Sequence, residues 1–228
     1  MNYILNIHTS SEKAIVNICD GDKVLSTVSN TEQNQHAAFL HVAIKNLLQK
    51  SNIKLSKLKA IGVTGGPGSY TGIRVGLATA KGLCFGLKIP MMMFNSLELM
   101  AFSAIKESRN PEKDTLFCPM IDARRMEVFT AVYNMDLKEI IEPAAQVLEE
   151  NSFSQLIQKN PFIFFGSGAE KFEKLISTIE NLRYILSEIS TEALAIFSWN
   201  QFQKKNFENL LNSHPMYIKD FYTTAKIN

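Results

Sequence analysis

The sequence predicts an α/β protein of two lobes, each with a mixed sheet and flanking helices. Short β-rich runs alternate with segments of helical periodicity along the whole chain. A polar break that contains a proline, at residues 109–114, separates two halves that open with a similar order of strands. We therefore predict a duplicated architecture with an N-terminal lobe at 1–109 and a C-terminal lobe at 110–228, although no repeat of residues is visible.

The first half begins with β-rich runs separated by short polar turns, which predicts an antiparallel meander. These runs are residues 3–9, 14–19 and 24–29. Apolar residues then recur at helical spacing within 31–51, which predicts an amphipathic helix with one buried stripe. A strand at 59–64, a glycine-rich loop and a helix at 73–87 form the next unit.

A further strand at 91–94 and a helix that begins near Ser96 complete the first half, and we expect Ser96 to be the N-cap. The second half opens with strands again, before a helix at 152–159 and an apolar strand at 162–165. The opening strands are expected at 116–121, 127–133 and 139–141. A Gly-Ser-Gly turn, another helix and a final amphipathic helix at 191–205 follow.

Composition narrows the function classes. The 24 basic residues nearly balance 22 acidic ones, and a formal charge of +2 does not favour a dedicated nucleic-acid binder. The three cysteines lie far apart in apolar runs, so we expect reduced core residues. The N-terminus reads as a strand and no run approaches the roughly 20 apolar residues of a membrane span, which predicts a cytoplasmic protein without membrane contact.

The glycine-rich loop at 65–72 is the sharpest local signal, because glycines between a strand and a helix allow positive φ and close backbone approach. It is neither a Walker loop nor a G-x-G-x-x-G loop. Its Gly66, Gly68 and Ser69 are candidates for binding an anion or nucleotide. Gly166 and Gly168, after the strand at 162–165, are a second candidate pair. A tight turn needed only for packing is the alternative at both places.

The helix after the loop carries an apolar stripe and a second stripe of mostly small residues. Because glycine inside a helix costs about 1 kcal/mol relative to alanine, this second stripe indicates the close approach of another helix. We predict a partner interface there, and a helix of the same chain is the alternative. The predicted interface residues are Gly72, Arg74, Gly76, Thr79, Leu83 and Gly86.

Other candidate sites are less specific. His36 and His41 lie roughly 140° apart on a helix, so they cannot share a metal ion, and no zinc motif is present. Trp199 is expected to pack in the core. The charged turn from Asp122 to Glu127 holds two adjacent arginines, which can bind an anion or form ion pairs.

Taken in order, these pieces resemble the TsaB (YeaZ) family over nearly the whole chain. The central block GVTGGPGSYTGIRVGLATAKGL at 62–83 carries the resemblance most specifically. The other segments are ILNIHTS at 4–10, QHAAFL at 35–40, IDARRMEVF at 121–129, FFGSGA at 164–169 and PMYIKDF at 215–221. The resemblance implies a duplicated fold of the actin, hexokinase and Hsp70 kind.

The resemblance also implies a role in making N6-threonylcarbamoyladenosine in tRNA. In that role the chain is an accessory subunit that is not itself an enzyme and needs no cofactor. It pairs with a catalytic TsaD-type subunit, is joined by a TsaE-type ATPase and forms a homodimer when alone. The homodimer uses the helices next to the glycine loop, and tRNA is reached only through the complex.

Some positions depart from the family or from its catalytic paralogue. His8 stands where an aspartate is usual at the end of the first strand, which argues against tight nucleotide binding. The metal-ligand histidines of TsaD fall on Ser96 and Met100, and neither is a plausible replacement ligand. An ATP-dependent small-molecule kinase of the same fold and a glycoprotease-like peptidase are the alternative functions.

Overall fold

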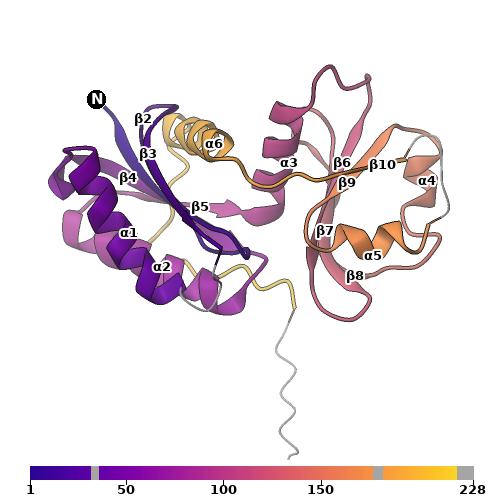
Figure 1. The fold of residues 1–228 in the computed structure, drawn as a ribbon, viewed down its shortest axis with the longest axis horizontal. Helices are drawn as coiled ribbons and strands as arrows, with labels where there is room; N and C mark the ends of the chain where they lie inside the picture. The colour runs from indigo at the N-terminus through magenta and orange to yellow at the C-terminus, as the bar shows by residue number, and fades with distance from the viewer. Residues whose placement is uncertain (32–35, 177–181, 220–228) are drawn as a thin grey trace, which may run out of the picture.

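The structure is a computed structural model that describes residues 1–31, 36–176 and 182–219. The described residues form two five-stranded sheets in two lobes, with helix α3 between them (Figure 1). No described helix is long and apolar enough to cross a membrane.

The first sheet combines an antiparallel meander with two parallel strands. Its order is β3-β2-β1-β4-β5, in which β1, β2 and β3 are antiparallel neighbours and β4 and β5 run parallel to β1. The strands are β1 (Tyr3–His8), β2 (Ala14–Asp20), β3 (Lys23–Asn30), β4 (Leu58–Gly66) and β5 (Met91–Asn95). The predicted meander is confirmed, and every predicted strand of this half is present.

The second sheet repeats this plan. Its order is β10-β9-β6-β7-β8, so that β6 again lies in the centre, with two antiparallel strands on one side and two parallel strands on the other. The strands are β6 (Leu116–Asp122), β7 (Glu127–Tyr133), β8 (Glu139–Val147), β9 (Phe162–Phe165) and β10 (Leu182–Ile185). The shared topology shows the duplication that the order of strands predicted.

Helices cover both faces of the first sheet. Buried residues of α1 (His36–Lys50) and α2 (Tyr70–Leu87) pack on the face that carries Leu5 and Ile7. Helix α6 (Thr191–Gln203) packs on the opposite face, against Ile4 and its neighbours. A short 3-10 helix, η2 (Leu55–Lys57), precedes β4.

Each half of the chain lends a helix to the sheet of the other half. Helix α3 (Ser96–Glu107) follows β5, and its Leu97, Ala101 and Ala104 pack against residues of the second sheet. Helix α6 comes from the second half and packs on the first sheet. The short helices α4 (Ser154–Ile157) and α5 (Ala169–Glu173) belong to the second lobe. The boundary at 109 and 110 stays a prediction.

Some elements differ from the expectations. Strand β10 was not predicted, β8 continues to Val147 beyond the expected 139–141, and the helix expected at 152–159 is a single turn. The N-cap of α3 is Asn95 rather than Ser96, because the Asn95 carboxamide oxygen accepts hydrogen bonds from the N–H groups of Leu97 and Glu98. The start expected for α1, within 32–35, lies outside the described residues.

Candidate functional site: the glycine loop and helix α2

The glycine loop joins β4 to α2 and packs against the turn between β1 and β2. Ser69 is the N-cap of α2, and its side chain accepts from the Gly72 N–H at 3.3 Å. The Ser69 N–H donates to the Ser10 carbonyl at 2.7 Å. A Cβ on Gly68, which has φ +148°, would collide with the same carbonyl. Close approach of the β1–β2 turn therefore accounts for glycine at 68.

The C-terminal strap, residues 213–219, covers the other side of this loop. The Met216 N–H donates to the Gly65 carbonyl at 2.8 Å. A Cβ on Gly66 would lie 2.8 Å from the Met216 carbonyl oxygen. Two segments of the same chain thus occupy the surroundings of Gly66, Gly68 and Ser69. Anion binding at these residues stays a prediction.

The second candidate loop, with Gly166 and Gly168, is also closely packed against neighbouring residues of the chain. A Cβ on Gly166 would lie 2.5 Å from the Met120 carbonyl oxygen and 2.6 Å from the Met100 methyl. The Gly168 N–H donates to the Met120 carbonyl at 2.9 Å, and a Cβ there would lie 2.6 Å from a methyl of Val128. The glycines let this turn pack on β6, β7 and α3, and anion binding here too stays a prediction.

The predicted interface residues on α2 do not share one surface. Gly72 and Gly76 are buried against the end of β1, where a Cβ on Gly72 would collide with the Thr9 carbonyl and one on Gly76 with the Thr9 hydroxyl. That hydroxyl donates to the Gly72 carbonyl at 2.8 Å. Thr79 and Leu83 are half-buried beside α1 and line a hollow there, while Gly86 is exposed. The alternative of packing within the chain therefore explains Gly72 and Gly76.

Large apolar side chains are exposed elsewhere on α2 and on α1. Phe85 is 78% exposed, and a Cβ on Gly82 would meet nothing within 4 Å. Val42 on α1 is 58% exposed. A hollow of about 280 Å³ lies between the two helices, lined by His41, Ile44, Ala78, Thr79, Gly82 and Leu83. We call Ala78, Gly82 and Phe85, together with His41 across the hollow, the α1–α2 face.

The sequence analysis did not name Ala78, Gly82 or Phe85, because it followed a different stripe of α2. Counting from Arg74, residues at helical spacing include Ala78, Gly82 and Phe85, all exposed. A large aromatic residue on an otherwise small and polar stripe was the available signal. Arg74 was predicted for the interface and is exposed at one end of the same stripe.

Arg74 ties α2 to the strap. Its Nε donates to the Tyr217 hydroxyl at 2.7 Å, and its guanidinium carbon lies 3.7 Å from the centre of the Tyr70 ring. The hydrogen bond with Tyr217 raises the pKa of Arg74 above its usual value. The side chain is therefore a fixed cation beside the glycine loop.

The charged turn after β6 forms ion pairs. The Asp122 carboxylate accepts from Lys171 Nζ at 2.7 Å, and Glu127 pairs with Lys219 of the strap. Burial acts to raise the pKa of Asp122, but hydrogen bonds from Lys171 and the Arg124 N–H outweigh it and lower the pKa. Arg124 and Arg125 are exposed and take left-handed φ values of 71° and 51°. Both acids of this turn therefore pair with lysines from other segments, and no ion pair of Arg124 or Arg125 is found among the described residues.

His8 ends β1 in a buried cluster of hydroxyl groups. It is 2% exposed, and its ring nitrogens lie 2.8 Å from Ser11 Oγ and 3.4 Å from Ser10 Oγ. Ser10 Oγ in turn lies 2.9 Å from Ser96 Oγ at the start of α3. His8 therefore belongs to a chain of hydrogen bonds that links β1 to α3.

Among the described residues, no group of three or more His, Cys, Asp or Glu side chains could hold a metal ion. Cys19, Cys84 and Cys118 are buried and free, and burial raises the pKa of each thiol to about 12. The thiols are therefore protonated at neutral pH and behave as small apolar groups.

The repeated sheet order, with a helix of each half packed on the sheet of the other, defines a duplicated protein of the actin-like class. The solved structure of YeaZ from Pseudomonas aeruginosa has this fold, with a TM-score of 0.76 at 21% identity over 95% of this chain and 100% of that chain. A family model described as TsaD, tRNA N6-adenosine threonylcarbamoyltransferase, matches residues 23–221.

Two relatives narrow the class to a family. The tRNA threonylcarbamoyladenosine biosynthesis protein TsaB of Bacillus subtilis is 30% identical over 179 residues, which cover 77% of this chain and 76% of that protein. TsaB of Buchnera aphidicola subsp. Baizongia pistaciae is 27% identical over 205 residues, which cover 82% and 85%. The chain belongs to the TsaB family of tRNA threonylcarbamoyladenosine biosynthesis proteins, which is related to TsaD, and the resemblance seen in the sequence is confirmed.

Proposed function

We propose that this chain is a non-catalytic dimerisation subunit of the complex that installs N6-threonylcarbamoyladenosine in tRNA. Its close similarity to TsaB proteins supports this role. The contacts of Ser96 and Met100, which occupy the positions of the TsaD ligand histidines, support it as well. Ser96 hydrogen-bonds with Ser10, and the Met100 methyl fills the space beside Gly166. Both side chains serve packing within the chain.

The exposed α1–α2 face is the observation that carries the proposal. Phe85 and Val42 leave large apolar side chains in water on neighbouring helices. Gly82 lowers the helix propensity of α2 by about 1 kcal/mol, and no neighbour among the described residues needs the space. A partner helix that packs over Gly82 and against Phe85 explains both features.

We propose that this face binds a TsaD-type catalytic subunit. When the protein is alone, the face binds a second copy of this chain. The family model described as TsaD matches residues 23–221, which include both helices of this face, and this similarity supports one face that serves both partners in turn. A TsaE-type ATPase then joins the pair, and tRNA meets the assembled complex.

A charge placed in the centre of the face tests the proposal. Phe85→Asp should convert a dimer to a monomer and weaken binding to a TsaD-type subunit at least about tenfold, because a carboxylate would be buried without a partner. Leu186→Asp is the matched control, since Leu186 is 92% exposed on the other lobe. Light scattering after size-exclusion chromatography and calorimetry with the purified subunit give the two readouts. Equal behaviour of both variants would refute the assignment of the face.

A further inference from the structure

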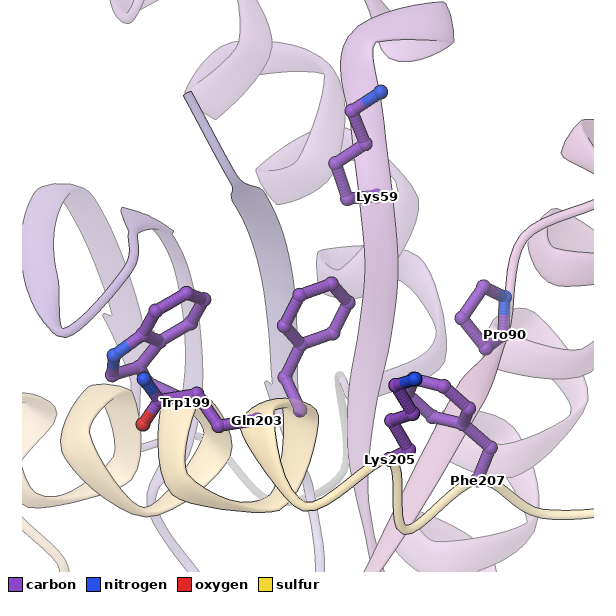
Figure 2. Close-up of a pocket in the computed structure, with 7 residues that line it drawn as sticks. Lys59, Pro90, Trp199, Gln203, Lys205 and Phe207 are labelled. Carbon is purple, nitrogen blue, oxygen red and sulfur yellow. The ribbon is translucent and has the colours of Figure 1, made fainter.

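A second exposed aromatic surface lies at the C-terminal end of α6, on the opposite face of the first sheet from α1 and α2. It is an open groove of about 400 Å³. Figure 2 shows Trp199 and Gln203 on the helix, Lys205 and Phe207 just after it, and Lys59 and Pro90 across from them. Phe202 completes the lining.

Three aromatic rings of this groove lie next to one another, two of them nearly parallel and the third tilted. Trp199 and Phe202 stack with ring centres 5.6 Å apart and planes inclined by 19°. The Phe202 and Phe207 rings have centres 5.8 Å apart and planes inclined by 59°, and Phe207 is 40% exposed. Trp199 rests on Gly21, where a Cβ would lie 3.7 Å from the indole. One side of the Trp199 ring is therefore packed within the chain, as expected. Trp199 also lines the groove.

Lysines line or border the groove. Lys59 and Lys205 are exposed, and neither makes an ion pair within the described part of the chain. Lys204 lies next to Lys205. Burial raises the pKa of Glu98, and the charge of Lys204 offsets part of this effect. The groove itself has no acidic lining residue among those described. Its charge suits an anionic ligand.

We propose that this groove binds a segment of single-stranded RNA, with bases stacked on the aromatic rings and phosphates beside Lys59 and Lys205. Accessible aromatic rings flanked by cations are the usual platform for unpaired bases. A volume of about 400 Å³ has room for a base, and the family acts in tRNA modification. The overall charge of +2 did not favour such binding, but attraction to phosphate depends on local charges.

Trp199 makes the test direct, because it is the single tryptophan of the chain. Titration of the full-length protein with an unpaired RNA of about eight nucleotides should quench Trp199 fluorescence, since such platforms cover roughly 4 to 16 nucleotides. The affinity should fall with salt, with a slope of about −0.7 for each phosphate neutralised. RNA duplex of the same length and polyglutamate are the comparison ligands, and both should bind less well.

Matched variants locate the binding. Phe207→Ala should weaken RNA binding at least about fivefold, the lower limit for loss of one stacked base. Lys205→Glu should weaken it and make the salt slope shallower. Lys159→Glu, at an exposed lysine of the other lobe, changes the net charge equally and should leave binding within about twofold.

Absence of quenching by RNA would overturn the inference. Equal quenching by polyglutamate would assign the groove to acidic peptides instead. Equal losses in Lys159→Glu and Lys205→Glu would show unspecific attraction and overturn it as well. None of these results depends on the α1–α2 face, so the outcome is separate from that of the proposed dimerisation role.

Discussion

Two glycines of α2, Gly76 and Gly82, have different surroundings and serve different purposes. Gly76 lies against Thr9, the residue just after β1, whose hydroxyl donates a hydrogen bond to the Gly72 carbonyl. Gly82 faces open space on the same helix. The sequence analysis assigned Gly76 to a partner interface. Helical spacing shows which residues share a stripe of a helix, but it does not show which segment or partner that stripe contacts.

Alanine at the two positions should have opposite effects on stability. Gly76→Ala should lower the free energy of unfolding by about 1 to 3 kcal/mol, since the new methyl group displaces the Thr9 hydroxyl and overpacks the contact with β1. Gly82→Ala should raise it by up to about 1 kcal/mol through better helix propensity. Urea unfolding of both variants measures the difference. A stabilised Gly76→Ala protein would show that α2 is not held against β1 as described.

At the scale of single elements, helix α3 depends on its first turn because it packs on both sheets. Asn95 caps it through hydrogen bonds of 2.8 Å from the Leu97 N–H and 3.4 Å from the Glu98 N–H. The Ser96 hydroxyl, expected to be the cap, instead bonds to Ser10. Adjacent cap candidates cannot be separated from the sequence, since the exact end of the preceding strand decides which residue takes the cap position.

Asn95→Ala should therefore lower the free energy of unfolding by about 1 kcal/mol, within the roughly 0.5 to 2 kcal/mol range for lost caps. Asn95→Asp should retain most of the stability, because a carboxylate accepts the same hydrogen bonds. Asn46→Ala, at an exposed position inside α1, is the control and should not destabilise the protein. Chemical denaturation compares the variants. If Asn95→Asp is as unstable as Asn95→Ala, the capping role is wrong.

At the scale of the whole molecule, the C-terminal strap joins the two lobes. It contacts the glycine loop through Met216 and α2 through Tyr217. On the other lobe, Lys219 pairs with Glu127 of β7, and Ile218 packs with a cluster of residues from α3 and β7. The strap thus adds a connection between the lobes besides the two helices that they exchange.

Ile218→Ala should weaken this connection without unfolding either lobe. We expect a loss of about 1 to 2 kcal/mol for the half-buried side chain and faster amide hydrogen exchange at both the glycine loop and β7. Leu211→Ala is the matched control, since Leu211 is 89% exposed just before the strap. Mass spectrometry of exchanged peptides distinguishes the variants. Faster exchange confined to residues 213–219 would contradict a role in joining the lobes.

The sequence by itself determined the class of fold, the order of nearly all strands and helices, and the family. These follow from local patterns, such as the alternation in β1 to β3 and the glycine block, which each segment carries within itself. Strand β10 escaped prediction because its four residues, Leu182–Ile185, gain their order from pairing with β9.

Only the tertiary structure decided what each surface meets. It placed α3 against the second sheet and α6 against the first, directed Gly72 and Gly76 toward β1, and left Phe85 and the Trp199 groove exposed. The physical reason is that an amphipathic pattern shows that one face of a helix will be buried. Burial of apolar surface has no direction of its own, so the choice of neighbour depends on packing between segments far apart in the chain.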